Sequence, residues 1–357
     1  MGASHLSRPG VVGCHGGVIP TRGRFARNAR RGVAPYGDVV RPTNRDLPPV
    51  ALADLPRAMH YGEFYGLKPI PDEKALLVVH GNCQAESIRL LLQDADDAPC
   101  VSVRVPAVHE LTPDEVPFLQ RLLDRAAVVL TQPVTAGYHD LPLGASEVQE
   151  AAPGARVLRW PVVWYAGLLP WQVVFTHPDE GDPPVVPYHD VRTVMLALGE
   201  PLPTAGPEGF RAVARWSLAE LRDREARAGA VPVSPFVVDS GARASNTVNH
   251  PGNPVLVSLA RAIQQRLGWP VTATDPGYEL LESVQTPCEG KVLEALGIEL
   301  SDGRDASEES WVVGGREVPD AEVVDAQLGW YRQHPEVLAA VANRSAERWR
   351  LLETTAA

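Results

Sequence analysis

A short apolar run that leads at once into a glycine turn and a helix is the feature that most limits how this chain can fold. Leu76 to Val79 form an unbroken apolar segment, which is typical of a strand covered on both faces. Ile88, Leu91 and Leu92 then recur at helical spacing. A buried strand that passes through Gly81 into a helix is typical of a parallel α/β sheet, and the turn then lies at the carboxyl edge of that sheet.

The same alternation continues along the chain. Cys100–Val105 and Ala127–Gln132 are predicted strands with a predicted helix, Pro113–Arg125, between them, and Arg156–Trp164 is a predicted fourth strand. Strands and helices in this order imply right-handed crossovers. We therefore predict an α/β fold of three layers, in which helices cover both faces of a parallel sheet.

After residue 164 the pattern changes from alternation to helices and proline-rich segments. Glu208–Ala228 is a predicted amphipathic helix, and Phe236–Asp239 is a predicted short strand. A further helix is expected over Val255–Leu267, with Asn253 as its N-cap. Two more helical segments, Glu279–Leu296 and Ala321–Leu352, complete the chain.

These patterns divide the chain into three parts. Residues 1–48 are expected to form a disordered extension, because arginines stand there among Gly, Pro and Ser. Residues 49–270 are expected to form the α/β domain, with a helical cap around residues 190–230. Residues 271–357 are predicted to be a mainly helical region packed on the core.

Composition excludes several classes of protein. The net charge of -11 and the lack of aromatic residues among the N-terminal arginines argue against a nucleic-acid-binding enzyme. No apolar run approaches the roughly 20 residues that cross a bilayer. The four cysteines are scattered, with no CxxC pair and no metal-ligand spacing, so we expect a reducing, cytoplasmic setting and no metal site. Glycine-rich signatures for NAD or ATP are absent from the sequence.

Cys83 stands at the strand-to-helix turn, where its thiol can be reactive. The positive end of a helix favours thiolate over thiol, and its N–H groups can receive an oxyanion during acyl transfer. The alternative is that Cys83 is a small apolar residue packed under the sheet, and this segment alone does not decide between the two.

Two motifs, Gly81-Asn82-Cys83-Gln84 and Asn249-His250-Pro251, together resemble the layout of SGNH hydrolases. In that layout a turn after the first strand supplies the nucleophile and a late His-Pro supplies the base. The strand–GNCQ–helix segment is more similar still to the WcbI-type polysaccharide biosynthesis family. That resemblance covers roughly residues 74–270. It implies an SGNH-like fold, coenzyme A binding and acetyl transfer to capsular sugars.

On this resemblance, Cys83 takes the place of the nucleophile and His250 that of the base. Thr247 stands where SGNH hydrolases have the acid that orients the histidine, so the triad is incomplete. Three other residues are candidates for orienting the imidazole, and His177 is a rival base. The three orienting candidates are Asp239, Asn246 and Asn249.

Acyl transfer also requires groups that support the oxyanion and hold the cofactor. Backbone N–H groups of Cys83 or Gln84 and the side-chain amides of Asn82 and Gln132 are the expected oxyanion support. Coenzyme A carries phosphates, for which a cluster of three loop residues near His250 is the expected site. That cluster is Arg243, Ser245 and Asn246. Four aromatic residues could line the pantetheine channel or stack on a sugar, although core packing is commoner for such residues. These are Trp160, Trp164, Tyr165 and Trp171.

The leading hypothesis is a cytoplasmic O-acyltransferase that uses acetyl-CoA and acts on a sugar or polysaccharide-precursor hydroxyl. Two alternatives use the same residues: a cysteine-dependent esterase or thioesterase with water as acceptor, and a degenerate module that binds carbohydrate or coenzyme A without catalysis. The expected partner is a saccharide acceptor, with no nucleic acid and no membrane span. A homo-oligomer is compatible with the sequence.

Overall fold

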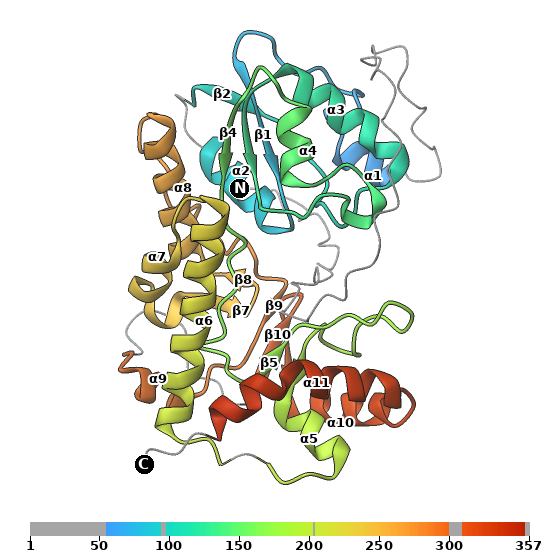
Figure 1. Ribbon diagram of the computed structural model, residues 1–357, viewed down its shortest axis with the longest axis vertical. Helices are drawn as coiled ribbons and strands as arrows, with labels where there is room; N and C mark the ends of the chain where they lie inside the picture. Colours follow the sequence, from blue (N-terminus) through green and yellow to red (C-terminus); the bar gives the residue numbers. More distant parts are fainter. Residues whose placement is uncertain (1–54, 94–97, 203, 300–308, 354–357) are drawn as a thin grey trace, which may run out of the picture. The chain divides into compact units, whose positions relative to one another are not determined.

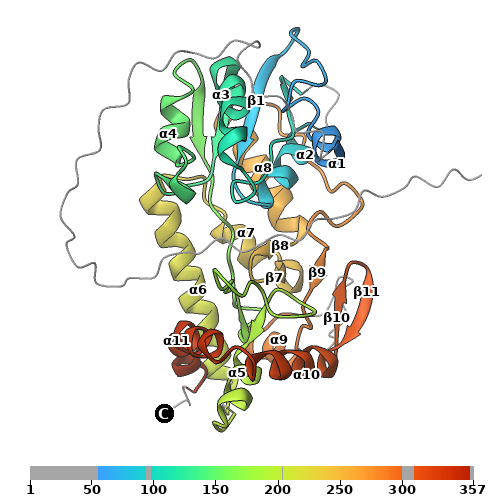
Figure 2. The same ribbon diagram turned by 90° about the vertical axis from the view of Figure 1, so that its right-hand side faces the viewer.

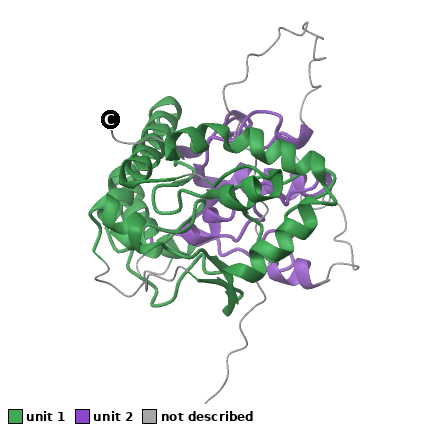
Figure 3. Cartoon of the chain, turned by 90° about the horizontal axis from the view of Figure 1, so that it is seen from below, with its two compact units in different colours: residues 1–16, 90–95, 159–357 green, residues 17–89, 96–158 purple. Residues whose placement is uncertain are grey.

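The computed structural model describes residues 55–93, 98–202, 204–299 and 309–353 (Figure 1). The predicted N-terminal extension, residues 1–48, lies outside the described residues. The chain divides into two compact units, which are described separately (Figure 3). The sheet unit contains residues 55–89 and 98–158 of the described chain, and the second unit contains nearly all of the remainder.

The sheet unit is built on a four-stranded sheet with the strand order β2-β1-β3-β4. Strand β1 pairs in parallel with both β2 and β3, so the carboxyl ends of these three strands share one edge. The prediction of a parallel sheet flanked by helices is therefore confirmed. The strands are β1 Ala75–His80, β2 Cys100–Ser102, β3 Ala126–Thr131 and β4 Arg156–Arg159.

Helices and a continuous apolar core cover the sheet. Leu76 and Val78 of β1 pack in one cluster with Phe118, Leu122 and Val148, which come from the surrounding helices. The side chains of β1 that point to the other face are also buried, as the unbroken apolar run predicts. The helices are α1 Leu55–His60, α2 Gln84–Gln93, α3 Val116–Arg125 and α4 Ala145–Glu150, with the short 3-10 turns η2 Pro113–Glu115 and η3 Tyr138–Asp140.

The second unit is mainly helical and carries three small antiparallel sheets. Helix α11 packs against α6 and α5, and α10 also contacts α5 (Figure 2). Its helices are α5 Val191–Leu198, α6 Pro207–Ala228, α7 Ser234–Asp239, the 3-10 turn η4 Gly241–Arg243, α8 Asn253–Leu267, α9 Gly290–Leu296, α10 Asp320–Tyr331 and α11 Pro335–Leu352. Its strands are β5 Gln172–Val173, β6 His189–Asp190, β7 Ser245–Thr247, β8 His250–Pro251, β9 Val284–Gln285, β10 Ser310–Val313 and β11 Arg316–Pro319.

The predicted strand at Phe236–Asp239 is wrong, because these residues belong to helix α7. A proline in the first turn of α7 favours helix initiation. The buried carboxylate of Glu225 also accepts hydrogen bonds from the N–H groups of Val233 and Ser234, at 2.7 and 2.8 Å. This tertiary contact holds the start of the helix and overrides the β propensity of a Phe-Val-Val sequence.

Other predictions needed correction at their boundaries. Strands β2 and β4 end at Ser102 and Arg159, before the predicted Val105 and Trp164. Only Gly290–Leu296 of the predicted helix Glu279–Leu296 is helical, because Val284–Gln285 forms strand β9. The predicted helix Ala321–Leu352 is two helices, α10 and α11, since a proline disfavours helical geometry in the residue before it, here His334. The N-cap of α8 is Gly252 rather than Asn253.

Candidate active site

Asn82 begins helix α2 and thereby places Cys83 at the helix N-terminus. The side-chain Oδ1 of Asn82 accepts a hydrogen bond from the N–H of Gln84 at 3.0 Å, and its carbonyl oxygen accepts the N–H of Ala85 at 2.9 Å. These bonds give Asn82 the role of an N-cap. The N–H of Gln84, one of the expected oxyanion donors, is therefore engaged by Asn82 in this structure.

Two buried glutamines, Gln84 and Gln132, hold the turn in place through their side-chain amides. Gln132, at the carboxyl end of β3, accepts the N–H of Asn82 with its Oε1 at 2.8 Å. Its Nε2 lies 3.5 Å from Oε1 of Gln84, and both glutamines are almost fully buried. Gly81 is required here, because a Cβ at this position would lie 2.6 Å from Oε1 of Gln132. The turn is thus held by side chains from β3 and α2 together.

Cys83, like Asn82, is partly exposed, whereas Gln84 and Gln132 are buried. Its thiol takes no part in a disulfide bond and is more accessible than those of the buried Cys100 and Cys288. The structure therefore disagrees with the alternative in which Cys83 is sealed beneath the sheet. A partly exposed thiol at a helix N-terminus, beside the carboxyl edge of a parallel sheet, has the placement expected of a nucleophile.

His80, the last residue of β1, is a buried neighbour of the turn. Its Nδ1 lies 3.0 Å from Oγ1 of Thr131, whose hydroxyl donates to the carbonyl of Gln132 at 3.1 Å. The Thr131 oxygen therefore accepts from His80, and the imidazole carries its proton on Nδ1. Burial lowers the pKa of His80 to about 4, so the ring is neutral at physiological pH.

In the second unit, His250 lies on the hairpin formed by β7 and β8 and is 2% exposed. Thr247, at the position of the expected acid, accepts the backbone N–H of His250 with its Oγ1 at 3.1 Å and donates to Oδ1 of Asn249 at 3.0 Å. The hydroxyl of Tyr188 binds both Thr247 and Asn249 at 3.0 Å. Thr247 therefore shapes the backbone at the histidine, and the ring of Tyr188 meets the imidazole edge-on at 6.5 Å.

The predicted phosphate-binding cluster lies on the same hairpin and the turn before it. Arg243 is 40% exposed and lies 3.7 Å from Asp275. Ser245 and Asn246 are buried in β7, and Nδ2 of Asn246 donates to Oε1 of Glu279 at 3.1 Å. Of the three, Arg243 alone presents a largely exposed polar group, and the role of the cluster in cofactor binding stays a prediction.

The other candidates near the predicted base have separate roles. His177 uses Nδ1 to accept the N–H groups of Asp179 and Glu180, both at 3.3 Å, which makes it a turn-capping residue. Asp239 is exposed at the end of α7. Trp160 is fully buried, so this indole is core packing.

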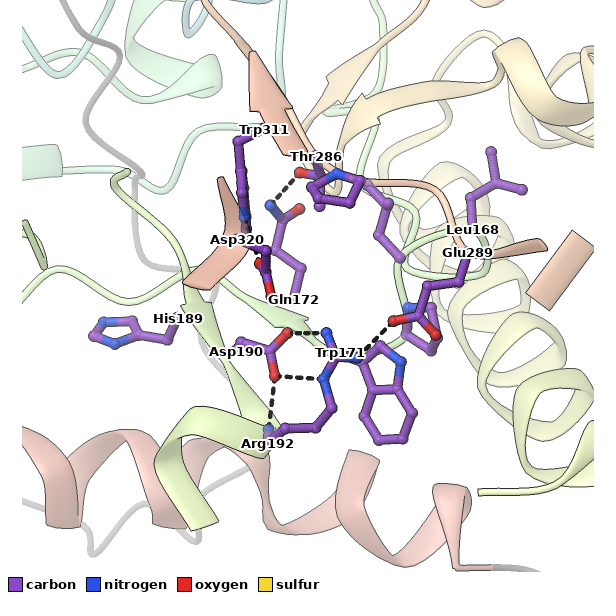
Figure 4. A pocket seen from close by; sticks show the side chains of 13 residues that line it. Leu168, Trp171, Gln172, His189, Asp190, Arg192, Thr286, Glu289, Trp311 and Asp320 are labelled. Atoms are coloured by element: carbon purple, nitrogen blue, oxygen red, sulfur yellow. Dashed lines mark hydrogen bonds and ion pairs between the residues drawn. The ribbon is translucent and has the colours of Figure 1, made fainter. Parts of the chain in front are cut away.

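A pocket in the second unit contains residues that the sequence patterns did not bring together (Figure 4). Arg192 forms a bidentate pair with Asp190, with N···O distances of 3.0 and 2.7 Å, and donates to Glu289 at 2.6 Å. Its guanidinium also lies 4.9 Å from the ring centre of Trp171. The lining residues are Leu168–Gln172, His189, Asp190, Arg192, Thr286, Pro287, Glu289, Trp311 and Asp320.

The pocket is rigidly built and connects to the hairpin of His250. Oε1 of Gln172 accepts the N–H of Val248 at 2.7 Å, and its Nε2 donates to Thr286 at 2.6 Å. Arg348, buried on α11, donates to the carbonyl oxygen of Gln172. The ring of Tyr188 stacks on Trp311 of the pocket while its edge meets His250. His189 points away from the pocket in Figure 4, toward Tyr331 and the carbonyl of Phe175.

The structure thus forms two groups of predicted residues. Asn82, Cys83, Gln84 and Gln132 lie together in the sheet unit, whereas Arg243, Ser245, Asn246 and His250 lie on one hairpin of the second unit. Among the described residues, no group of three or more His, Cys, Asp or Glu side chains is placed to hold a metal ion. In the same part of the chain, no helix is long and apolar enough to cross a membrane.

Comparison with known proteins identifies a family by sequence and a solved structure with a similar fold. The model of the polysaccharide biosynthesis enzyme WcbI family matches residues 76–272. The chain is similar to a solved structure of WcbI, with a TM-score of 0.65 and 15% identity, over 78% of this chain and 97% of the other. That structure is described as the native protein without a disulfide bond between coenzyme A and one of its cysteines. None of the curated proteins compared with the chain matches it.

Proposed function

Since the chain belongs to the family of the polysaccharide biosynthesis enzyme WcbI, we propose that it transfers an acyl group from coenzyme A to a hydroxyl group of a polysaccharide precursor. The transferred group is proposed to be acetyl. The observation that carries the proposal is the partly exposed Cys83 at the N-terminus of α2. The family match includes both this turn and His250.

Coenzyme A fits the chemistry of the Cys83 turn. The description of the WcbI structure mentions coenzyme A together with a cysteine, as the native protein without a disulfide bond between the two. Among the cysteines that the structure describes, Cys83 is the accessible one, and Arg104 lies in the loop that follows β2, with 35% of its side chain exposed. The same loop contacts the turn, because the N–H of Val108 donates to the carbonyl of Gly81 at 2.8 Å. Arg104 is thus a second candidate for phosphate binding besides Arg243.

In the proposed reaction, the sulfur of Cys83 attacks the carbonyl carbon of the acyl thioester. The carbon–sulfur bond to coenzyme A breaks, the coenzyme leaves as its thiol, and the acyl group is held on Cys83. The oxygen of an acceptor hydroxyl then attacks the same carbon while His250 removes its proton, and the thiolate of Cys83 leaves. In the direct alternative, His250 activates the acceptor for attack on the thioester, and Cys83 shapes the site.

Several finer properties belong to the same proposal. Asn82, Gln84 and Gln132 are proposed to support the oxyanion, with Gln84 and Gln132 acting through the geometry of the turn. The fold is proposed to be SGNH-like, with helix layers on both faces of the sheet and a helical cap. The acceptor is proposed to be a capsular saccharide and the location cytoplasmic, and a homo-oligomer is compatible with these roles.

Ligand-induced stabilisation tests the cofactor. A ligand present at 100 times its Kd raises the free energy of unfolding by about 2.7 kcal/mol, which gives a clear increase in Tm. We expect coenzyme A and acetyl-CoA to raise the Tm of the full chain, with NADH and ATP as controls that do not. An unchanged Tm with saturating acetyl-CoA would contradict the proposal.

A further inference from the structure

Two polar groups of the pocket in the second unit lack a partner in this structure. Nε1 of Trp171 is a buried donor, and no described residue accepts its hydrogen bond. Asp320 accepts Nε1 of Trp311 with Oδ1 at 2.7 Å, and no described residue binds its second oxygen, Oδ2. A buried N–H without an acceptor is costly, so this pocket is suited to a ligand that accepts from Trp171.

The other charged groups of the pocket and the amide of Gln172 already have partners, in the lining or next to it. The guanidinium of Arg192 is shared between Asp190 and Glu289, and Lys291 pairs with the other oxygen of Glu289 at 2.9 Å. The amide of Gln172 is used on both of its atoms. The ligand therefore meets a polar frame in which the Trp171 donor and the second oxygen of Asp320 are open, while Oε2 of Glu289 has its ion pair with Lys291 but no hydrogen bond.

The charge of the lining limits the class of ligand. Three carboxyl groups, those of Asp190, Glu289 and Asp320, outnumber the two cations Arg192 and Lys291 that lie beside them. Burial, and to a lesser extent the charge of Asp190, raise the pKa of Asp320. A phosphate would be repelled by these carboxylates, and a cation cannot accept from the indole N–H of Trp171. Hydroxyl groups suit both open positions, because a hydroxyl can accept a hydrogen bond from Trp171 and another can donate one to Asp320.

We propose that this pocket binds an uncharged, hydroxyl-rich ligand, a saccharide, with Trp171 and Asp320 as its hydrogen-bonding residues. The indoles of Trp171 and Trp311 supply apolar surface, as expected for contact with the C–H face of a sugar ring. The proposal rests on the acyltransferase function, for which this pocket is the acceptor subsite. It also adds to that function, because neither the Cys83 turn nor the His250 hairpin assigns a place to the acceptor.

Tyr188 connects this subsite to the predicted base. Its ring stacks on Trp311 at 6.5 Å, its edge meets His250 at 6.5 Å, and its hydroxyl binds Thr247. Gln172, on the pocket wall, binds the N–H of Val248, two residues before the histidine. A saccharide in the pocket is thus held by the same framework that positions the imidazole.

Intrinsic tryptophan fluorescence of the full chain tests the proposal directly. The probes are neutral methyl glycosides of glucose, galactose and mannose, with glucuronate and glucose 6-phosphate as anionic probes of similar shape. We expect saturable quenching by at least one neutral glycoside at concentrations up to about 100 mM, since weak sugar sites have Kd values in the millimolar range. The anionic probes should bind at least about tenfold more weakly, because of the carboxyl groups.

Two substitutions remove one open group each, and the second of them also keeps the side-chain volume. Trp171→Phe removes the indole donor, and Asp320→Asn replaces the open carboxylate oxygen while leaving an acceptor for Trp311. Each should raise the Kd of the neutral glycoside by roughly tenfold, as expected for one lost hydrogen bond in a buried site. Trp160→Phe is the matched control, because Trp160 also has a buried Nε1 without a partner but lies outside the pocket.

Each outcome decides the proposal. If no neutral glycoside quenches the fluorescence, the pocket holds only water and the proposal is wrong. It is equally wrong if Trp171→Phe and Trp160→Phe bind alike, or if the anionic probes bind best. Failure of coenzyme A to stabilise the chain, together with glycoside binding that depends on Trp171, would instead reject the acyltransferase function and leave the saccharide pocket standing.

Discussion

At the scale of single residues, the candidate site depends on the close packing of neutral side chains against the backbone. The turn that carries Cys83 exists because Gly81 has no Cβ, which lets Gln132 reach the N–H of Asn82. On the second unit, Thr247 stands where an acid was expected and binds the backbone of His250. The first feature becomes visible only when Gln132, distant in sequence, is placed beside the turn.

Gly81→Ala should destabilise the sheet unit. The new methyl group would overlap Oε1 of Gln132 and break the hydrogen bond to Asn82. Overpacking of this kind costs about 1–3 kcal/mol in the free energy of unfolding, measured by urea denaturation. Gly154→Ala is the control, since nothing lies within 4 Å of its added Cβ. Equal stability of the two variants would disprove this account of Gly81.

His80 should make the protein sensitive to acid. Its pKa is 6.5 in the unfolded chain and about 4 in the buried site, so the unfolded state binds the proton more readily. The stabilisation is complete above pH 6.5 and falls as the pH drops toward 4, by about 3 kcal/mol in total.

The variant His80→Asn isolates this effect. Its amide can still donate to Thr131, but it does not titrate. We expect the free energy of unfolding of the wild-type chain to fall more steeply than that of the variant between pH 6.5 and pH 4. Parallel pH profiles would show that His80 is already protonated in the folded protein.

At the scale of elements, the sequence predicted what local pattern controls. The apolar run and the glycine correctly predicted β1, the turn and α2, and amphipathic spacing predicted α6. Helix α7 was missed because its first turn is held by Glu225, a residue of another helix. Similarly, the pocket lining comes from five separate stretches of chain, and no pattern within one stretch reveals it.

Glu225 should therefore control the start of α7. Its carboxylate accepts two backbone N–H groups and the hydroxyl of Ser234, at 2.7 to 2.8 Å, while buried at 6% exposure. Glu225→Ala leaves these donors without their acceptor, and we expect a loss of about 2–4 kcal/mol in the free energy of unfolding. Glu220→Ala, an exposed position on the same helix, should change it by less than about 0.5 kcal/mol. If both variants lose a similar free energy of unfolding, the hydrogen bonds from Glu225 to the start of α7 contribute nothing, and Glu225 stabilises α6 alone.

At the scale of the whole molecule, the proposed reaction uses residues of both units: Cys83 belongs to the sheet unit and His250 to the second unit. The family match runs through both, from β1 in the sheet unit to the segment after α8 in the second unit. The sequence predicted the family and the parallel sheet, but the meeting of Cys83 and His250 in one site stays a prediction. It concerns the arrangement of the units, which no pattern within either one determines.

The most direct measurement of this claim is the rate at which acetyl-CoA acylates Cys83, followed by intact-mass analysis and peptide mapping. We predict a single acetyl adduct on Cys83 in the wild-type chain and none at this site in Cys83→Ala. In His250→Gln, the acceptor should remove the adduct at least about 100-fold more slowly, because the general base is lost. Circular dichroism checks that this variant is folded. Turnover by Cys83→Ala at the wild-type rate, or removal of the adduct at the same rate without His250, would contradict the account.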